Sequence, residues 1–200
     1  MTVREYERAT PARRIGYRLY RNPVLMLFVG PTFVFLFQRR FPQRGMSRPI
    51  LVSVVLTNLA LLGWAVGWSL LVGPPTFLLI QGTTLVAGGA IAAWLLYIQH
   101  QHEDTYYESG ETWQFEQAAL QGSSYLRLPP ALAWVVGNAN FHHVHHLSAK
   151  IPNYRLRAAH EEQPIFAQTP VVTVGAGIRA LKLKLWDEDR GGLVRFPRPT

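Results

Sequence analysis

Two long apolar stretches dominate the pattern of hydrophobic and polar positions along this chain. Residues 50–72 and 76–98 are 23 residues each, and the whole of 50–98 carries no Asp, Glu, Lys, Arg or His. At about 1.5 Å rise per residue, either stretch can cross a hydrocarbon core of about 30 Å as a helix. The Gly-Pro-Pro between them, at 73–75, is short, uncharged and unsuited to continue a helix. The pattern therefore predicts two transmembrane helices joined in a tight hairpin.

A third apolar stretch, at 22–38, has a different setting. Basic clusters flank it on both sides, within residues 13–21 and 39–48. A full crossing would leave one of these clusters on the far side of the membrane, against the preference of Lys and Arg for the cytoplasmic side. Gly30-Pro31 lies midway along the stretch and is expected to interrupt a helix. We interpret 22–38 as a re-entrant or interfacial segment.

The basic residues also orient the predicted hairpin, whose tip is uncharged. They precede the first span and follow the second: Arg39, Arg40, Arg44 and Arg48 before it, and Arg127, Lys150, Arg155 and Arg157 after it. Both ends of the hairpin are therefore predicted to be cytoplasmic, in a multi-pass protein of the cell membrane. The net charge of +8 does not indicate a nucleic-acid partner, because the arginines flank apolar segments instead of alternating with aromatic residues on one surface.

The remaining residues, 99–200, are predicted to form a cytoplasmic part that contains helices. The second span is expected to continue as a helix through residues 99–107, and another helix is expected near 111–121. After a break at 127–130, a short helix carries histidines and must end before Pro152. A helical patch near 170–186 and an irregular basic tail complete the chain. The predicted fold class is an all-α integral membrane protein, with 1–200 as one partial domain.

Histidines are concentrated in one part of the chain. All seven lie between residues 100 and 160, and four of them fall within residues 142–146. On a helix, His142, His145 and His146 stand at i, i+3 and i+4 and share one face, whereas His143 points away from it. Three neutral imidazoles on one face suit a transition metal such as iron or zinc. We therefore predict that His142, His145 and His146 are metal ligands.

His100 is predicted to be a fourth ligand, because it follows the second span where the helix emerges at the cytoplasmic surface. Other polar residues near the histidines are candidates for a supporting role around the metal: Asn138, Glu103, Asp104, His102 and His160. Glu103 or Asp104 would orient an imidazole or bind the metal directly. Asn138 would approach the metal from one turn before His142, or else cap a helix. His102 and His160 are also consistent with surface positions.

Four sequence blocks stand in order after the second span: "YIQHQHEDTYYE", "GSSYLRLP", "GNANFHHVHHLSAKIPNYRL" and "AAHEE". Together they closely resemble the C-terminal half of membrane fatty acid desaturases, in particular the bacterial delta-12/omega-6 type. The earlier blocks "VREYERAT" and "LTNLALL" are similar to the middle of such proteins. The resemblance thus runs through nearly the whole chain.

The resemblance implies a helical membrane bundle that holds a di-iron centre on its cytoplasmic side through three histidine boxes. It implies an oxidoreductase of lipid metabolism and fatty acid biosynthesis, which removes hydrogens from a lipid acyl chain with dioxygen and two electrons from a ferredoxin or cytochrome-type donor. His142, His145 and His146 match the third box, and His100 matches the histidine after the last transmembrane helix. His102 stands where an aromatic residue is usual, so no ligand role is carried over to it.

The upstream part of the family pattern is not found in this sequence. No histidine precedes residue 100, where two further boxes and another transmembrane hairpin are expected. Four ligands do not complete two irons. We therefore expect this chain to correspond to the C-terminal half of a desaturase, through truncation, a misplaced start codon or a split enzyme. Alone, it is not expected to support desaturation.

Other interpretations of the sequence remain open. Hydroxylation shares the same hydrogen abstraction and is not distinguished from dehydrogenation. The alternative class is a non-catalytic or single-metal-binding membrane module that associates with a complete desaturase. A metal transporter is disfavoured, because neither predicted span contains an ionisable residue. Lys150, Arg155 and Arg157 would suit an acidic electron donor or anionic lipid head groups.

Overall fold

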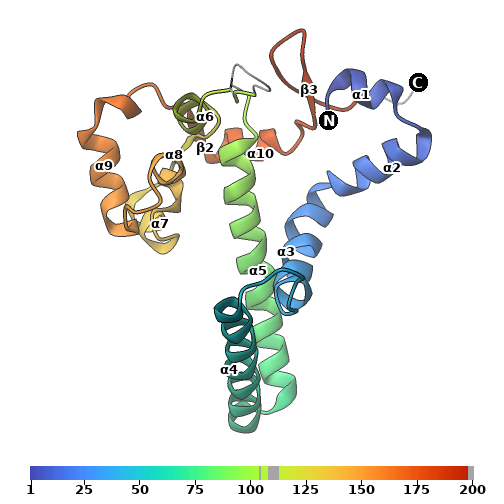
Figure 1. The fold of residues 1–200 in the computed structure, drawn as a ribbon, viewed down its shortest axis with the longest axis vertical. Helices are drawn as coiled ribbons and strands as arrows, with labels where there is room; N and C mark the ends of the chain where they lie inside the picture. The colour runs from blue at the N-terminus through green and yellow to red at the C-terminus, as the bar shows by residue number, and fades with distance from the viewer. Residues whose placement is uncertain (104, 108–112, 198–200) are drawn as a thin grey trace. The chain divides into compact units, whose positions relative to one another are not determined.

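A computed structural model describes residues 1–103, 105–107 and 113–197 of the chain (Figure 1). The chain divides into two compact units, one made of Met1–Arg18 with Trp94–Thr200 and the other of Leu19–Ala93. Helices make up most of the structure, and the few strands are three residues long. The prediction of a mostly helical protein is therefore confirmed, although the fold is not purely α-helical.

Two long apolar helices are the main elements of the Leu19–Ala93 unit. Helix α4 spans Arg48–Val72 and helix α5 spans Pro74–His100, which extends into the other unit. Both are long and apolar enough to cross a membrane, and no residue of α4 is buried in the protein. A surface of exposed leucine, valine and tryptophan along a whole helix is what lipid contact requires. The two apolar helices are confirmed, and their insertion into a membrane remains a prediction.

The turn between α4 and α5 is shorter than predicted. Gly73 alone separates them, with a positive φ of 84°, and its N–H donates to the Ser69 carbonyl. Glycine adopts this conformation without the strain that a Cβ would cause. Pro74 and Pro75 do not lie in the loop but begin α5, because proline fits the first helical turn, where no N–H partner is needed.

The segment 22–38 is helical throughout most of its length, so Gly30-Pro31 does not interrupt it as expected. Wide π-helical turns, η1 (Leu25–Val29) and η2 (Val34–Gln38), flank one turn of α-helix, α3 (Gly30–Phe33). The N–H of Gly30 reaches back five residues to the Leu25 carbonyl, and a wide turn of this kind accommodates the proline ring that follows. By length and composition, residues 11–38 would also pass as a bent third span. The interpretation of 22–38 as a re-entrant or interfacial segment, instead of a full crossing, remains a prediction.

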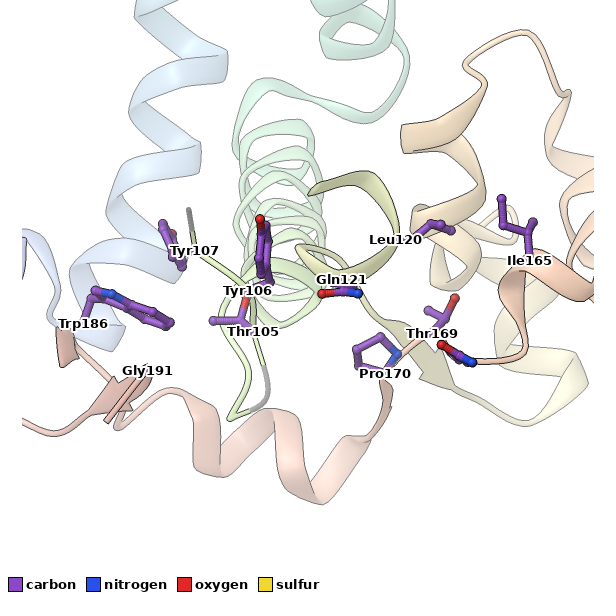
Figure 2. A pocket seen from close by; sticks show the side chains of 11 residues that line it. Thr105, Tyr106, Tyr107, Leu120, Gln121, Ile165, Thr169, Pro170, Trp186 and Gly191 are labelled. Atoms are coloured by element: carbon purple, nitrogen blue, oxygen red, sulfur yellow. The ribbon is translucent and has the colours of Figure 1, made fainter. Parts of the chain in front are cut away.

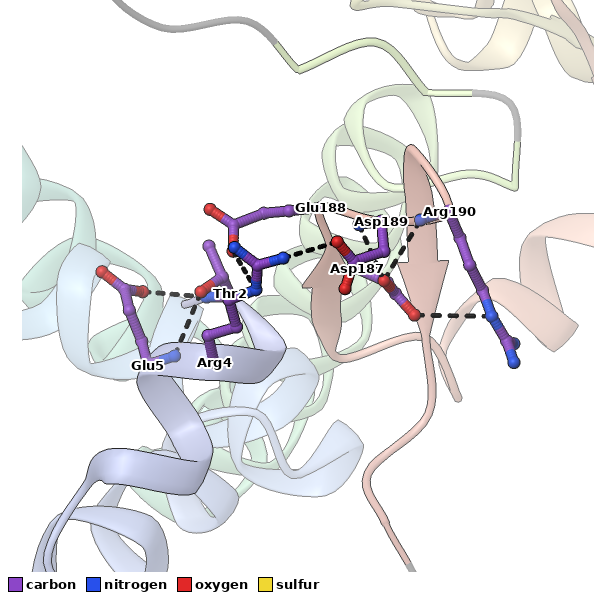
Figure 3. A network of polar contacts seen from close by, with 7 residues as sticks. All are labelled: Thr2, Arg4, Glu5, Asp187, Glu188, Asp189 and Arg190. Carbon is purple, nitrogen blue, oxygen red and sulfur yellow. Dashed lines mark hydrogen bonds and ion pairs between the residues drawn. The ribbon is translucent and has the colours of Figure 1, made fainter.

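Helices α1 (Val3–Arg8) and α2 (Pro11–Tyr20) open the chain, and α1 packs against the C-terminal tail. A capping box between Thr2 and Glu5 begins α1, and Arg4 forms ion pairs with Glu188 and Asp189 (Figure 3). Such exposed pairs contribute little individually. They accompany a β-bridge from Thr2 to the tail, which joins the two ends of the described chain.

The tail was expected to be irregular, but it contains a small antiparallel hairpin. Strand β3 (Leu185–Asp187) pairs with β4 (Gly192–Val194). In the turn between them, the carboxylate of Asp187 accepts hydrogen bonds from the backbone N–H groups of Asp189 and Arg190 (Figure 3). An aspartate that bonds to the backbone two residues later is a standard way to stabilise a turn.

The predicted helical patch at 170–186 is helical only in α10 (Val174–Ala180). It is preceded by strand β2 (Val171–Thr173), which pairs in parallel with β1 (Tyr125–Arg127). The β-branched residues of β2 and their alternating burial favour a strand there. At Gly177 α10 approaches α5 so closely that an added Cβ would lie 2.9 Å from Ile98.

The end of α5 also differs from the prediction. The helix stops at His100 instead of continuing through 99–107, and the hydroxyl of Thr105 donates to the His100 carbonyl that the missing turn would have used. Asp104 lies outside the described residues. Helix α6 covers Phe115–Gln121, so the part of the predicted 111–121 helix before residue 113 cannot be compared.

Short helices fill the rest of the larger unit. The predicted break at 127–130 lies between the end of β1 and the start of the first of these helices. They are α7 (Pro130–Val135), η4 (Ala139–Phe141), α8 (His142–Leu147), η5 (Asn153–Arg155), α9 (Leu156–Glu162) and η6 (Pro164–Phe166). Their buried core consists of Phe141, Val144, Leu156 and Phe166. Helix α8 carries the histidines and ends before Pro152, as predicted.

Candidate metal centre

Three of the seven histidines converge at the point where α5 meets α8. His100 is the last residue of α5, and His142 and His146 lie one turn apart on α8. The Nε2 atoms form a nearly equilateral triangle, with 3.1 Å between His100 and His142, 3.2 Å between His100 and His146, and 3.0 Å between His142 and His146. One residue from a long helix and two from a short one therefore meet at a single point.

The triangle has the dimensions of a metal site. Three imidazole nitrogens bound to one ion at about 2.0–2.1 Å, with angles between a right angle and the tetrahedral angle, lie roughly 2.8–3.4 Å apart. All three edges of the triangle fall in this range. Nitrogen donors of this kind suit iron, zinc and copper. The residues present therefore fit a bound transition metal.

A backbone carbonyl selects the tautomer of His100. Its Nδ1 lies 3.2 Å from the carbonyl oxygen of Gly122, which only accepts hydrogen bonds. The proton of neutral His100 is therefore on Nδ1, and the Nε2 lone pair is available to a metal. Gly122 directly follows α6, where an added Cβ would lie 2.5 Å from the Ala118 carbonyl oxygen. A glycine at this position lets the chain turn tightly enough to place its carbonyl beside His100.

Burial and mutual repulsion keep the imidazoles of His142 and His146 neutral. Burial, followed by repulsion from His146, His100 and His145, lowers the pKa of His142 from 6.5 to about 4. Burial and the same kind of repulsion also lower the pKa of His146. Neutral imidazole is the form that binds metals, since the protonated ring has no free lone pair. At neutral pH these histidines are therefore ready to act as ligands.

His145 lies beside the triangle but outside it. Its side chain is exposed, and its ring stacks on that of His142 with 5.7 Å between centroids. Among the described residues, only His100, His142 and His146 have ligand atoms that all approach one another within 4.8 Å. Of the four predicted ligands, three are brought together, and a ligand role for His145 remains a prediction.

A second pair of histidines joins the opposite face of α8 to α9. His143 is completely buried, and its Nε2 lies 2.9 Å from Nδ1 of His160. The rings of Tyr125, Phe141 and Phe166 surround the pair. Burial, and then repulsion from His160, lower the pKa of His143 to about 3. His143 thus anchors α8 in the core, which holds the side of the helix that carries His142 and His146 in place.

Comparison with known proteins connects this geometry to a family. A family model described as fatty acid desaturase matches residues 4–173, which include all seven histidines. The chain belongs to the fatty acid desaturase family. It is 44% identical over 196 residues to a fatty acid desaturase of Bacillus subtilis, and this match covers 98% of the chain and 56% of the relative. It is also 33% identical over 64 residues to a chloroplastic omega-6 fatty acid desaturase of Arabidopsis thaliana, which covers 32% of the chain and 14% of that relative.

The chain thus spans only about half the length of the Bacillus desaturase that it matches. Family membership confirms the resemblance stated from the histidine blocks. Members of the desaturase family typically use iron, which is a metal that the three-histidine group can bind.

The residues predicted to support the site of this desaturase-family chain are dispersed. His102 is buried away from the three-histidine group, and Glu103 is exposed. His160 contacts His143 instead of the triangle. Asn138 is not on the histidine helix but in a left-handed conformation before η4, where its amide donates to the Asn153 carbonyl. Because Asn138 is not helical, it does not lie one turn before His142 on the same helix face.

Sequence reasoning missed two contributors to the site. The Gly122 carbonyl could not have been found from side-chain chemistry, because it acts through the backbone. The pairing of His143 with His160 brings together residues 17 positions apart. The only available signal was that both are histidines in a chain where histidines are few.

Proposed function

We propose that this chain takes part in the dioxygen-dependent dehydrogenation of lipid acyl chains, with His100, His142 and His146 holding an iron. The observation that supports the proposal is the triangle of three Nε2 atoms, each 3.0–3.2 Å from the others, at the end of an apolar helix. In the overall reaction, a CH₂–CH₂ unit, O₂, two electrons and two protons yield a CH=CH unit and two water molecules. Iron, when bound, supplies the oxidising power that breaks an unactivated C–H bond.

The protein residues have definite tasks in this proposal. His142 and His146 present their lone pairs from one face of α8, and the Gly122 carbonyl holds the third lone pair, that of His100, in position. The pair of His143 and His160 keeps α8 in register from the other side. A second iron would require further ligands in addition to these three. Exposed His145 would be one of the further ligands. Further ligands would come from outside the described residues.

The membrane has a part in the proposal as well. Helices α4 and α5 would cross the bilayer with the histidine-bearing part on the cytoplasmic side, because basic residues flank both ends of the hairpin. An acyl chain would then reach the iron from the lipid phase. Lys150, Arg155 and Arg157 would receive an acidic electron donor of the ferredoxin or cytochrome type.

Metal analysis of the purified chain tests this proposal. We expect about one iron per chain at limiting iron, and the substitution His142→Ala should abolish this equivalent. His145→Ala should leave it unchanged and should affect only a second, weaker equivalent. Equal iron content in the wild type and in His142→Ala would contradict the proposed ligand set.

The alternative proposal is a module that binds a single metal and associates with a complete desaturase. The presence of only three convergent histidine nitrogens among the described residues favours it. Membranes containing the chain alone, a complete desaturase alone, or both should separate the two proposals. New double bonds in membranes with the chain alone would exclude the non-catalytic alternative.

A further inference from the structure

The two compact units each contain a cavity, and the two cavities have different linings. The one shown in Figure 2, of about 550 Å³, has polar side chains such as Thr105 and Gln121 around it. The other, of about 700 Å³, lies wholly within the Leu19–Ala93 unit, every residue of which the structure describes. Its lining is mostly leucine, phenylalanine and tryptophan, and most of it belongs to α4 and α5. We call this second cavity the hairpin groove.

The hairpin groove has a polar end and an apolar end. Arg40 and Asn58 line the polar end, where the Asn58 amide donates a hydrogen bond of 2.7 Å to the Arg40 carbonyl. Asn58 lies roughly 22 Å along α4 from the turn at Gly73, whereas Phe77 of the lining lies within about 6 Å of that turn along α5. Gln81 is a further polar residue of the lining, between the two ends. The groove therefore extends along the hairpin, from Arg40 towards the turn.

Arg40 is the residue that points to a ligand. It is partly buried, and its Nε donates to the Phe35 carbonyl at 2.9 Å. Its two terminal nitrogens have no hydrogen-bond or ion-pair partner among the described residues. Residues 19–93 contain five arginines and no Asp or Glu, so this unit provides no carboxylate that could pair with Arg40. A cation beside an apolar surface is costly unless an anion pairs with it.

The rest of the lining defines the chemistry of the missing anion. A guanidinium group binds phosphate or carboxylate oxygens through two N–H groups at once. The apolar part of the lining comes from η2, α4 and α5, and includes Phe35, Leu36, Leu61, Trp64, Phe77 and Leu85. A molecule that fits both parts has an anionic group at one end and a hydrocarbon chain that extends from it.

We propose that the hairpin groove holds one anionic phospholipid, with its phosphate on the terminal nitrogens of Arg40 and one acyl chain along the apolar lining. The excess of arginine in this unit favours a lipid with net negative charge over a zwitterionic one. Since η2 lines one side of the groove and the hairpin the other, the lipid stabilises the contact between them. None of the candidate metal ligands lines the groove, so this lipid is not the acyl chain that the proposed reaction oxidises.

Lipid retention by the full chain tests the proposal. The chain is reconstituted in nanodiscs of phosphatidylcholine and phosphatidylglycerol in equal amounts, and native mass spectrometry identifies the lipids that stay bound after release into detergent. Oleate, added as a competitor, represents a free fatty acid. We expect a single phosphatidylglycerol to be retained in preference to phosphatidylcholine, and oleate should not displace it.

Two pairs of variants test the two ends of the groove. Arg40→Gln should lower the retention of phosphatidylglycerol about tenfold, because it removes the charged hydrogen bonds to phosphate. Arg44→Gln, the same exchange at an exposed arginine outside the lining, should leave retention unchanged. Gly82 lines the groove and Gly88 does not, and both have open space for a Cβ. Gly82→Leu should therefore also lower retention, by filling the groove without altering Arg40, and Gly88→Leu should not.

Each of several outcomes would overturn the proposal: equal retention of the two phospholipids, displacement by oleate, or retention that is unchanged in both Arg40→Gln and Gly82→Leu. An equal loss in Arg40→Gln and Arg44→Gln would also overturn it, because general attraction to basic residues would then explain the binding. The inference shares with the proposed function only the membrane position of α4 and α5. Iron content measured in the same samples is independent of lipid retention, so the lipid site and the iron centre can fail separately.

Discussion

The two ends of helix α5 lie in opposite environments. Most side chains before residue 94 are exposed, including Leu78 and Leu79, whereas Leu95, Ile98 and Gln99 are at most 7% exposed. The first part presents an apolar surface, and the last part belongs to a packed core that ends at the candidate metal ligand His100. The same helix therefore contains a long apolar stretch and, at its end, a candidate metal ligand.

The largest effect of a substitution in α5 is expected at its histidine-bearing end. His100→Ala removes one of three convergent nitrogens and is expected to weaken metal binding by at least about 100-fold, more than the loss of a supporting residue would. Gly88→Ala on the same helix has open space for its Cβ and should leave affinity unchanged. Titration with cobalt(II), followed by its visible absorption, measures both variants. Similar affinities in the two variants would contradict the assignment of His100.

The lipid-facing character of the hairpin is tested next. Leu59 is 59% exposed near the middle of α4, and Leu59→Lys should disfavour insertion by about 3 kcal/mol. Ile50→Lys, close to the start of the helix, should cost much less, because a lysine there reaches the membrane surface. A glycosylation-based insertion assay measures the two. Equal insertion of both variants would show that α4 does not cross the hydrocarbon core.

The packed end of α5 is sensitive to the close approach of α10. A Cβ at Gly177 would lie 2.9–3.2 Å from Ile98 and Trp94, so Gly177→Val should destabilise this unit by about 1–3 kcal/mol. At Gly175 the nearest atom to an added Cβ is the end of Arg179, at 3.7 Å, and Gly175→Val is the matched control. Thermal unfolding in nanodiscs distinguishes the two. A larger loss in the control would mean that α10 does not pack here.

Acidification should destabilise the metal-free protein. The pKa of His142 is about 4 in the folded chain and that of His143 about 3, below the ordinary value of 6.5, so the unfolded chain binds protons more readily. Stability of the metal-free protein is therefore fully present above pH 6.5 and declines as pH falls through about 4. Unfolding midpoints measured with a chelator between pH 7 and pH 4 should follow this course. His142→Gln should flatten the pH dependence, and a midpoint that rises on acidification would contradict the explanation.

Features that a local sequence pattern encodes could be predicted. The apolar helices were predictable, because uncharged stretches of 23 residues have few alternatives, and the helix face shared by His142 and His146 was predictable too. The strands β1 and β2 were not, since each is three residues long and forms only by pairing with the other. The end of α5 at His100 depends on Thr105, which turns back to cap it. Burial of His143 was also invisible, because helical spacing shows which residues share a face but not what covers it.

The 27 residues of α5 span about 40 Å, and the last of them is the candidate metal ligand His100. Each residue inserted into this helix would move His100 by about 1.5 Å and rotate it by about 100°. A single insertion or deletion would turn the imidazole away from His142 and His146, even if the helix still crossed the membrane. Changes in length are tolerated only as whole turns, so we expect related chains to differ in the composition of α5 far more readily than in its residue count.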